Sequence, residues 1–207
     1  MQKTLAPTKG NLMSAKNTLQ LSKQGYEMLD KKRNILIREM MQLIEEAKDV
    51  EARIEETFAQ AYRALESANV LMSVTSVTEH AHSAAFEDSV EIDLRSVMGV
   101  EIPVVRAKKF SGRPIYGFSN TTSALDEAFL KFNEVKMLTV RLTEIENSVY
   151  RLAMNIKKTQ KRANALENIT IPLYETIVKD IGNALEEKDR EEHSRLKVIK
   201  NQKEKNG

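Results

Sequence analysis

Histidines and carboxylates between residues 79 and 88 form the group with the clearest potential for metal chemistry. Glu79, His80 and His82 precede Glu87 and Asp88, and imidazole and carboxylate groups are common zinc ligands. On an extended segment, alternate histidines point in the same direction. Zinc would need further ligands brought together in space. An exposed polar linker is therefore the favoured interpretation, and a metal enzyme is the alternative ranked last.

The rest of the sequence offers little catalytic chemistry. His193 lies among Glu191, Glu192 and Arg195, a pattern typical of a solvated helix face rather than of a catalytic base. The sequence contains no phosphate-binding loop, dinucleotide-binding loop, nucleophile elbow or metalloprotease helix. It also has 0 cysteines, which excludes a thiolate zinc site and a cysteine nucleophile. We expect no catalytic residues, no cofactor and no metal.

A basic run at Lys157, Lys158, Lys161 and Arg162 is the candidate for contact with nucleic acid. No aromatic residues alternate with these cations, and the helical periodicity assigns them to outer faces. The formal net charge of the chain is only +2, which attracts nucleic acid weakly. The sequence therefore predicts no nucleic-acid partner.

The elements that carry these residues are predicted to be long helices. Charged residues make up 30% of the chain, aromatic residues 5%, and Trp is absent, a composition typical of coiled coils. Without proline from residue 8 to 72, one helix would extend about 95 Å. Its apolar rows have seven-residue spacing, which is typical of a coiled coil. One row holds Leu5, Leu12, Leu19, Tyr26, Met40, Ala47, Ile54, Ala61 and Ala68, interrupted by Arg33, and the other holds Leu29, Leu36, Leu43 and Val50, then Phe58 and Leu65 one position later.

The C-terminal half repeats this pattern. Its row consists of Val135, Leu138, Leu142, Ile145, Val149, Leu152, Ile156, Thr159, Ala163, Leu166, Thr170, Leu173 and Ile177. Each apolar row must be covered by a partner helix. We therefore predict an α-dominated fold, in which the N- and C-terminal helices form a long antiparallel left-handed coiled coil. The predicted parts are residues 1–72, a central region at 73–121, and residues 122–207.

The central region is predicted to contain a β-hairpin at about residues 90–105. Apolar residues alternate at Val90, Ile92 and Leu94, and again from Val100, on either side of a turn at Met98 and Gly99. A solitary hairpin is marginally stable in water. We expect it to rest against the coiled coil or against another protein.

Pro172 interrupts the C-terminal helical pattern. Proline in a helix interior costs roughly 3 kcal/mol because it removes a hydrogen bond and crowds the preceding turn. The apolar row nevertheless continues on both sides, from Leu166 to Ile177. A bend or a local break near Pro172, rather than the end of the helix, is predicted.

The chain lacks the apolar runs of a signal peptide or a membrane span. Together with the absence of cysteine, this predicts a soluble protein of the cytoplasm with no direct membrane insertion.

Several segments, in the right order, resemble the D subunit of the V-type and archaeal-type rotary ATPases. The most specific is KRANALENITIP at residues 161–172, followed by ETI at 175–177 and LEEKDREEHSRLKVIK at 185–200. APTKGNL at 6–12 with LSKQGYEMLDKKRNIL at 21–36, and VMGVEIP at 97–103, resemble the first helix and the hairpin turn of that family. The signature motif corresponds here to Asn164, Ala165, Leu166, Glu167, Ile171 and Pro172.

This resemblance implies a non-catalytic central-stalk rotor, peripheral to the membrane, that couples ATP hydrolysis or synthesis to the transport of protons or sodium ions. The implied partners are the hexamer of catalytic A and B subunits, the F subunit of the central stalk, and the subunit that caps the membrane ring. The F subunit is expected on the outer faces of the middle of the shaft and on the hairpin. The topology assigns contact with the hexamer to the terminal segments, at Thr8, Lys9, Leu12, Lys16, Leu196, Lys197 and Lys200. A bend at Pro172 would make the rotor asymmetric.

A passive coiled-coil scaffold, or the stalk of an export apparatus, is the alternative. Either would share the heptads and the lack of catalytic residues. Neither predicts the combination of the Asn-Ala-Leu-Glu motif with the hairpin turn.

Overall fold

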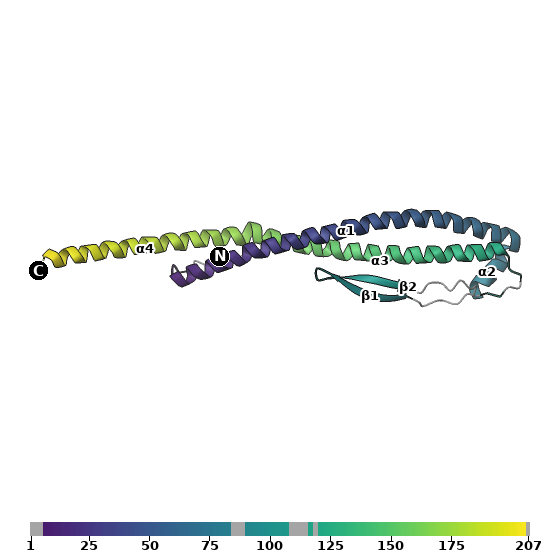
Figure 1. Ribbon diagram of the computed structural model, residues 1–207, viewed down its shortest axis with the longest axis horizontal. Helices are drawn as coiled ribbons and strands as arrows, with labels where there is room; N and C mark the ends of the chain where they lie inside the picture. Colours follow the sequence, from purple (N-terminus) through teal and green to yellow (C-terminus); the bar gives the residue numbers. More distant parts are fainter. Residues whose placement is uncertain (1–5, 84–89, 108–115, 118–119, 206–207) are drawn as a thin grey trace. The chain divides into compact units, whose positions relative to one another are not determined.

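The computed structural model describes residues 6–83, 90–107, 116–117 and 120–205 (Figure 1). Most of them are helical, as the sequence predicts. The chain divides into two compact units, which we describe separately: a terminal unit, Met1–Asn34 with Lys157–Gly207, and a central unit, Ile35–Ile156. The elements in chain order are α1 (Lys9–Met72), α2 (Val74–Ser83), β1 (Val90–Val97), β2 (Val100–Ala107), α3 (Ser123–Ala165), the π-helical turn η1 (Leu166–Thr170) and α4 (Ile171–Lys205).

Local chemistry fixes both ends of α1. Thr8 is the N-cap, because its side chain accepts a hydrogen bond of 3.2 Å from the backbone N–H of Asn11. At the other end, Ser73 adopts a left-handed conformation with φ of 70°. That conformation ends an α-helix, so the chain turns there and α2 begins at Val74.

The buried residues along α1 recur at seven-residue spacing in two rows. One row holds Ala15, Ser22, Leu36, Val50, Thr57 and Ala64, with Leu29 and Leu43 half-buried at the intervening positions. This row was instead predicted to move by one position, to Phe58 and Leu65. Both of these residues are only half-buried. The other predicted row is completely buried at Ala61 and Ala68. Small side chains such as Ala61 and Ala68 allow the close approach of a partner helix, and Leu36 is buried as deeply.

In the central unit, α1 and α3 run antiparallel (Figure 1). Leu36 shares a buried cluster with Leu152 near one end, and Ala68 shares another with Leu125 near the other end. Between them, the Arg141 guanidinium donates hydrogen bonds of 3.0 Å to Glu46 across the pair and 2.6 Å to the buried Glu144.

The hairpin covers one side of this helix pair. Its turn at Met98 and Gly99 has positive φ at both residues, 50° and 75°, the conformation of a tight two-residue hairpin. Val100 and Ile102 join the cluster of Leu36 and Leu152. The prediction that the hairpin rests against the helices is therefore confirmed.

The second cluster of the central unit fixes α2. Val77 of α2 packs against Ala68, Tyr116 and Leu125, and the Tyr116 hydroxyl donates a 2.6 Å hydrogen bond to Asp126. The segment that carries Glu79, His80 and His82 was predicted to be a polar linker, and this is wrong because these residues lie in α2. An apolar face on α2 packs on the helix pair, which favours a helix over an extended segment.

In the terminal unit, α1 lies antiparallel to the end of α3 and the start of α4. Arg33 donates a 2.7 Å hydrogen bond to Gln160, and Lys23 forms a 2.7 Å ion pair with Glu175. The buried residues here include Ala15, Ala163 and Ile181.

The helix does not end at Pro172. Instead, η1 precedes it, and the backbone N–H of Ile171 bonds to the carbonyl of Leu166, five residues earlier. A proline ring crowds the carbonyl four residues before it, and a wider turn at that point provides room. The placement of Leu173 in the buried row is wrong: its side chain is 43% exposed, and Tyr174 is half-buried in its place.

Candidate functional surfaces

The predicted contact residues lie on helix ends of the terminal unit. Lys9 and Lys16 are exposed, and Leu12 is half-buried. Thr8, also exposed, serves as the N-cap of α1. These residues therefore combine a structural role at the helix start with an accessible basic surface.

The C-terminal part of α4 is the most accessible helical segment of the chain. Every residue from Glu186 to Glu204 is exposed, and α4 continues beyond the start of α1 (Figure 1). Leu196 is 64% exposed, and Lys197 and Lys200 accompany it. This part of α4 has no neighbouring helix within the described residues.

Sequence reasoning missed two apolar residues of this segment. Val198 is 56% exposed and Ile199 50% exposed, next to Leu196. An isolated helix gains nothing from such residues in water. Their apolar character within a segment dominated by charged residues was the available signal.

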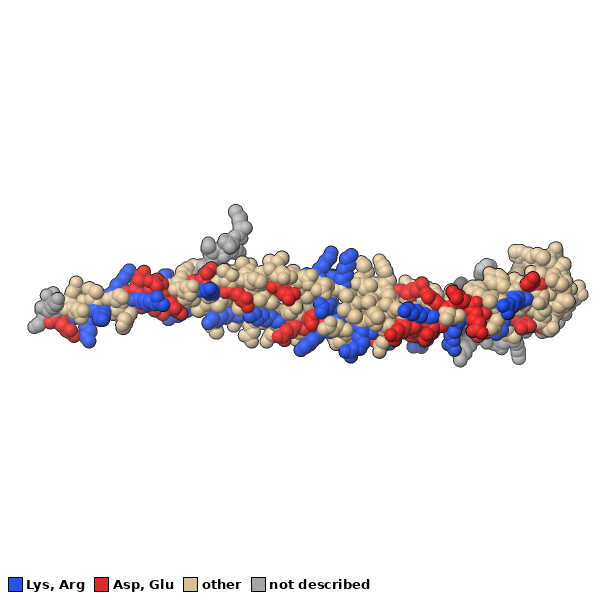
Figure 2. All heavy atoms as spheres, turned by 90° about the horizontal axis from the view of Figure 1, so that it is seen from above, with Lys and Arg blue, Asp and Glu red and all other residues tan. Residues whose placement is uncertain are grey.

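On the face seen in Figure 2, the charged side chains of the described residues are of mixed sign. Figure 2 shows Lys and Arg side chains interspersed with Asp and Glu over the visible face. Lys157, Lys158, Lys161 and Arg162 are exposed, in agreement with their predicted outer positions. Such mixed surfaces suit protein partners better than a polyanion.

The exposed face of the hairpin is apolar. Val90, Ile92 and Leu94 of β1 are 47%, 67% and 59% exposed, and they share one face because β1 alternates. Met98 in the turn is 48% exposed. The hairpin thus packs on α1 and α3 with one face and presents an apolar face to its surroundings.

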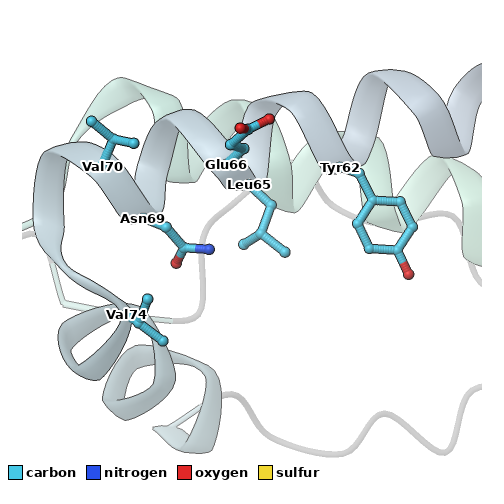
Figure 3. A pocket seen from close by; sticks show the side chains of 6 residues that line it. All are labelled: Tyr62, Leu65, Glu66, Asn69, Val70 and Val74. Carbon is cyan, nitrogen blue, oxygen red and sulfur yellow. The ribbon is translucent and has the colours of Figure 1, made fainter.

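A second apolar surface surrounds the turn from α1 to α2 (Figure 3). Tyr62, Leu65 and Val70 line an open hollow of about 510 Å³ together with Val74. Val70 is 80% exposed and Val74 64% exposed. Apolar patches of this kind mark interaction sites.

The signature motif lies in and around η1. Asn164, Ala165 and Glu167 are exposed, whereas Leu166 points toward α1, where its Cδ1 lies 3.7 Å from the position a Cβ would take on Gly25. The motif's last residues, Ile171 and Pro172, begin α4.

Polar contacts also tie the motif together. The side chain of Gln160 donates a 2.6 Å hydrogen bond to Asn164. The charge of Glu167 raises the pKa of Tyr26 on α1 above its ordinary value. The motif is therefore part of the contact between α1 and η1, and part of its surface remains accessible.

The metal hypothesis gains no support from the described residues, where no group of three or more His, Asp and Glu side chains is positioned for a metal ion. His80 and His82 lie on α2 rather than on a strand, so their side chains diverge by about 200°. The His80 ring lies 5.9 Å from that of Tyr116. Glu87 and Asp88 fall outside the described residues.

Within the part of the chain that the structure describes, no helix combines the length and the apolar character required to cross a membrane.

The family model of the ATP synthase D subunit matches residues 11–201. The chain belongs to the family of ATP synthase D subunits. The resemblance carried by the motif at residues 161–172 is therefore confirmed.

Relatives of this family member cover nearly its whole length. The D subunit of the V-type ATP synthase of Thermotoga neapolitana is 44% identical over 197 residues, which cover 95% of this chain and 97% of the relative. The D subunit of the A-type ATP synthase of Methanobrevibacter smithii is 38% identical over 202 residues, 96% of this chain and 87% of the relative. The corresponding A-type D subunit of Thermococcus kodakarensis is 36% identical over 197 residues, 94% of this chain and 92% of the relative.

Proposed function

We propose that this member of the D-subunit family is the central-stalk rotor of a V-type or A-type rotary ATPase. It is a non-catalytic shaft that couples ATP hydrolysis or synthesis in the A and B hexamer to the transport of protons or sodium ions. The relatives named as D subunits of V-type and A-type ATP synthases support membership of such a complex. The observation that carries the proposal is the fully exposed segment Glu186–Glu204 of α4.

The side chains of that segment suit a helix that is inserted into a surrounding ring of protein subunits. It carries apolar side chains at Leu196, Val198 and Ile199 between basic residues such as Lys197 and Lys200. Exposure of these apolar side chains to water is unfavourable. A surrounding protein covers the apolar residues and pairs with the charges. The start of α1, with Lys9 and Lys16, belongs to the same contact with the hexamer.

Two further surfaces match the remaining partners. The apolar face of the hairpin, at Val90, Ile92 and Leu94, is the proposed site for the F subunit. The outer edge of β1 also offers backbone groups to a partner, because the sheet formed by the described residues has two strands. The apolar surface at Tyr62, Val70 and Val74 is the proposed site for the subunit that caps the membrane ring.

Coupling requires that the rotor touch equivalent catalytic sites unequally. A partner shifts a conformational equilibrium only through differential contact. The bend predicted near Pro172 would supply this asymmetry, and η1 is the local irregularity from which such a bend could arise.

Reconstitution from purified components tests the proposal. The full chain, the A and B hexamer and the F subunit are mixed, and ATP turnover is measured together with rotation of a bead attached to the chain. We expect rotation with the full chain and loss of rotation when the chain is truncated after Leu185. The truncated chain should still fold, because the removed residues are exposed.

A hairpin variant serves as the matched control. Ile92→Ser with Leu94→Ser removes exposed apolar side chains from the central unit, so it should weaken the binding of the F subunit and leave association with the hexamer intact. A full chain that binds neither the hexamer nor the F subunit contradicts the proposal. That result would favour the passive scaffold or the export-apparatus stalk.

A further inference from the structure

The π-helical turn η1 shifts the buried row of the C-terminal helix by one residue. Before it, Thr159 and Ala163 are buried at the predicted heptad positions. After it, the heptad continuation reaches Leu173, yet that residue is 43% exposed. The row that packs in the terminal unit lies one residue later and contains Tyr174, Val178, Ile181 and Leu185.

A π-turn accommodates one more residue than an α-turn of the same height, which accounts for this shift. Two interactions identify the widened turn. The N–H of Ile171 bonds to the carbonyl of Leu166, and the Thr170 hydroxyl lies 3.3 Å from the carbonyl of Ala165, each spanning five residues.

The sequence of α4 therefore contains two apolar rows, one residue apart. The observed row is the one from Tyr174 to Leu185. The other is the heptad continuation, in which Leu173 is exposed and Ile177 and Ala184 are half-buried. Adjacent residues on a helix differ by about 100° in direction, so the two rows face directions that differ by that angle.

Opposing effects act on the two arrangements. The heptad continuation would bring Asp180 toward α1, which disfavours it. Extending the α-helix through this turn would also restore the crowding of Pro172 against the preceding turn. The observed arrangement, however, requires the irregular η1 and leaves the large apolar side chain of Leu173 in water.

Among the described residues, no strong polar contact fixes the observed row. The ion pair of Lys23 with Glu175 joins α1 to α4 just beyond η1, but both side chains are about half exposed, at 52% and 50%. Exposed ion pairs contribute about 0–1 kcal/mol. This contact alone does not fix one register.

We propose that η1 is a register joint. It exchanges between the π-turn and an α-turn, and each exchange rotates α4 about its own axis by about 100° and moves it along that axis by about 1.5 Å. Leu173 then replaces Tyr174 against α1, and the half-buried Ile177 turns further toward α1 while Val178 turns away. The exposed segment of α4 turns with the helix and presents a different side to its surroundings.

This inference does not depend on the proposed function, because it concerns an equilibrium within the chain itself. Helix register shifts occur on the microsecond-to-millisecond timescale. Packed helices with two alternative arrangements switch between discrete states rather than deforming continuously.

Fluorine NMR of the full chain labelled with 3-fluorotyrosine tests the joint. The chain has 5 tyrosines, and Tyr174→Phe assigns the relevant signal. We expect relaxation dispersion at Tyr174, because its ring is half-buried in one register and solvated in the other. An absence of exchange at Tyr174 overturns the proposal.

Two variants should abolish that exchange. Leu173→Ser removes the apolar side chain that stabilises the alternative register and leaves the observed row intact. Deletion of Asn168 removes the extra residue of η1, so that a continuous α-helix would bury the same row. Leu196→Ser is the matched control, because that leucine is exposed on α4 and lies in neither row. In this variant, the exchange at Tyr174 should equal that of the unaltered chain.

Exchange that persists unchanged in Leu173→Ser also overturns the proposal. Flipping of the Tyr174 ring alone would give that result, since it does not require the side chain of Leu173. Deletion of Asn168 supplies an independent measurement if the serine variant alters packing around the ring.

Discussion

The central and terminal units use the same pairing of antiparallel helices and differ in what covers it. In the central unit, Leu36 and Leu152 are 0% exposed, and the hairpin adds Val100 and Ile102 to their cluster. In the terminal unit, the buried positions include Ala15, Ser22 and Thr159, and no third element is described beside them. The apolar side chains of the hairpin therefore enlarge the core of the central unit, whereas the helix pair of the terminal unit is described without such a cover.

The irregular features follow this difference. The π-turn, the second apolar row and the exposed end of α4 all belong to the terminal unit. The central unit instead places its accessible apolar residues on the hairpin and beside the turn from α1 to α2. The comparison indicates that stability is concentrated in the central unit and conformational freedom in the terminal unit.

The largest effect is expected for Leu36→Ala. It removes a side chain that is 0% exposed, so the free energy of unfolding should fall by about 2–5 kcal/mol. Urea denaturation followed by circular dichroism measures the change. Leu196→Ala, at a side chain 64% exposed, is the control, with an expected change of about 0.5 kcal/mol or less. Equal losses for the two variants would remove the distinction between the units.

Arg141→Leu should have the next largest effect. The guanidinium links Glu46 with the buried Glu144, and the hydrogen bond to Glu46 raises the pKa of Arg141. Its loss leaves the Glu144 carboxylate buried without this partner, at a cost of about 1–3 kcal/mol.

The same denaturation assay measures the Arg141 variant. Arg190→Leu provides the matched control, because its ion pairs with Glu186 and Glu187 lie at the surface, where such pairs contribute about 0–1 kcal/mol. A smaller loss for Arg141→Leu than for this control would contradict the role assigned to the buried carboxylate.

Pro172→Ala should raise stability and impair coupling. The substitution restores a backbone donor and removes the crowding of the proline ring, and we expect a gain of about 1 kcal/mol because η1 already relieves part of the roughly 3 kcal/mol cost. In the reconstituted complex, ATP turnover should be less tightly linked to rotation. Unchanged coupling in a variant whose helix has become straight would refute the proposed asymmetry.

Tyr116→Phe should have a similarly small effect, about 1 kcal/mol, because it removes the hydrogen bond to Asp126. Burial, and then that hydrogen bond, raise the pKa of Tyr116 above its ordinary value of 10.0. The folded state favours the neutral phenol, so this stabilisation is complete below about pH 10 and declines as the pH rises further.

Denaturation between pH 8 and pH 11 tests the alkaline effect of Tyr116. The Tyr150 side chain is 66% exposed, so comparison with Tyr150→Phe separates the contribution of Tyr116 from general alkaline destabilisation. If both variants lose stability above about pH 10 as steeply as the unaltered chain, Tyr116 is not the responsible group.

Much of the fold could be predicted from residue spacing. The heptad rows through Leu36 and Leu152 predicted the helix pair, because seven-residue spacing places apolar side chains along one side of a helix. The alternation around Met98 and Gly99 predicted the hairpin and its turn, and glycine at position 99 adopts the positive φ of the turn without steric cost. The segment KRANALENITIP predicted the family.

Other features of the fold could not be predicted from residue spacing. The helical state of residues 74–83 depends on Val77 packing against Ala68 and Tyr116, which are close only after the chain has folded. The exposure of Val198 and Ile199 depends on how far α1 extends beside α4. Leu196 was predicted to be a contact residue, whereas the apolar residues beside it were noticed only through their exposure.

The sequence by itself determined the helices, the hairpin and the family, because periodicity, turn residues and motifs act locally along the chain. Only the tertiary structure decided which of two apolar rows on α4 is buried. Both rows satisfy the periodicity of a helix, and the choice between Leu173 and Tyr174 depends on packing against α1 and on the extra residue held in η1.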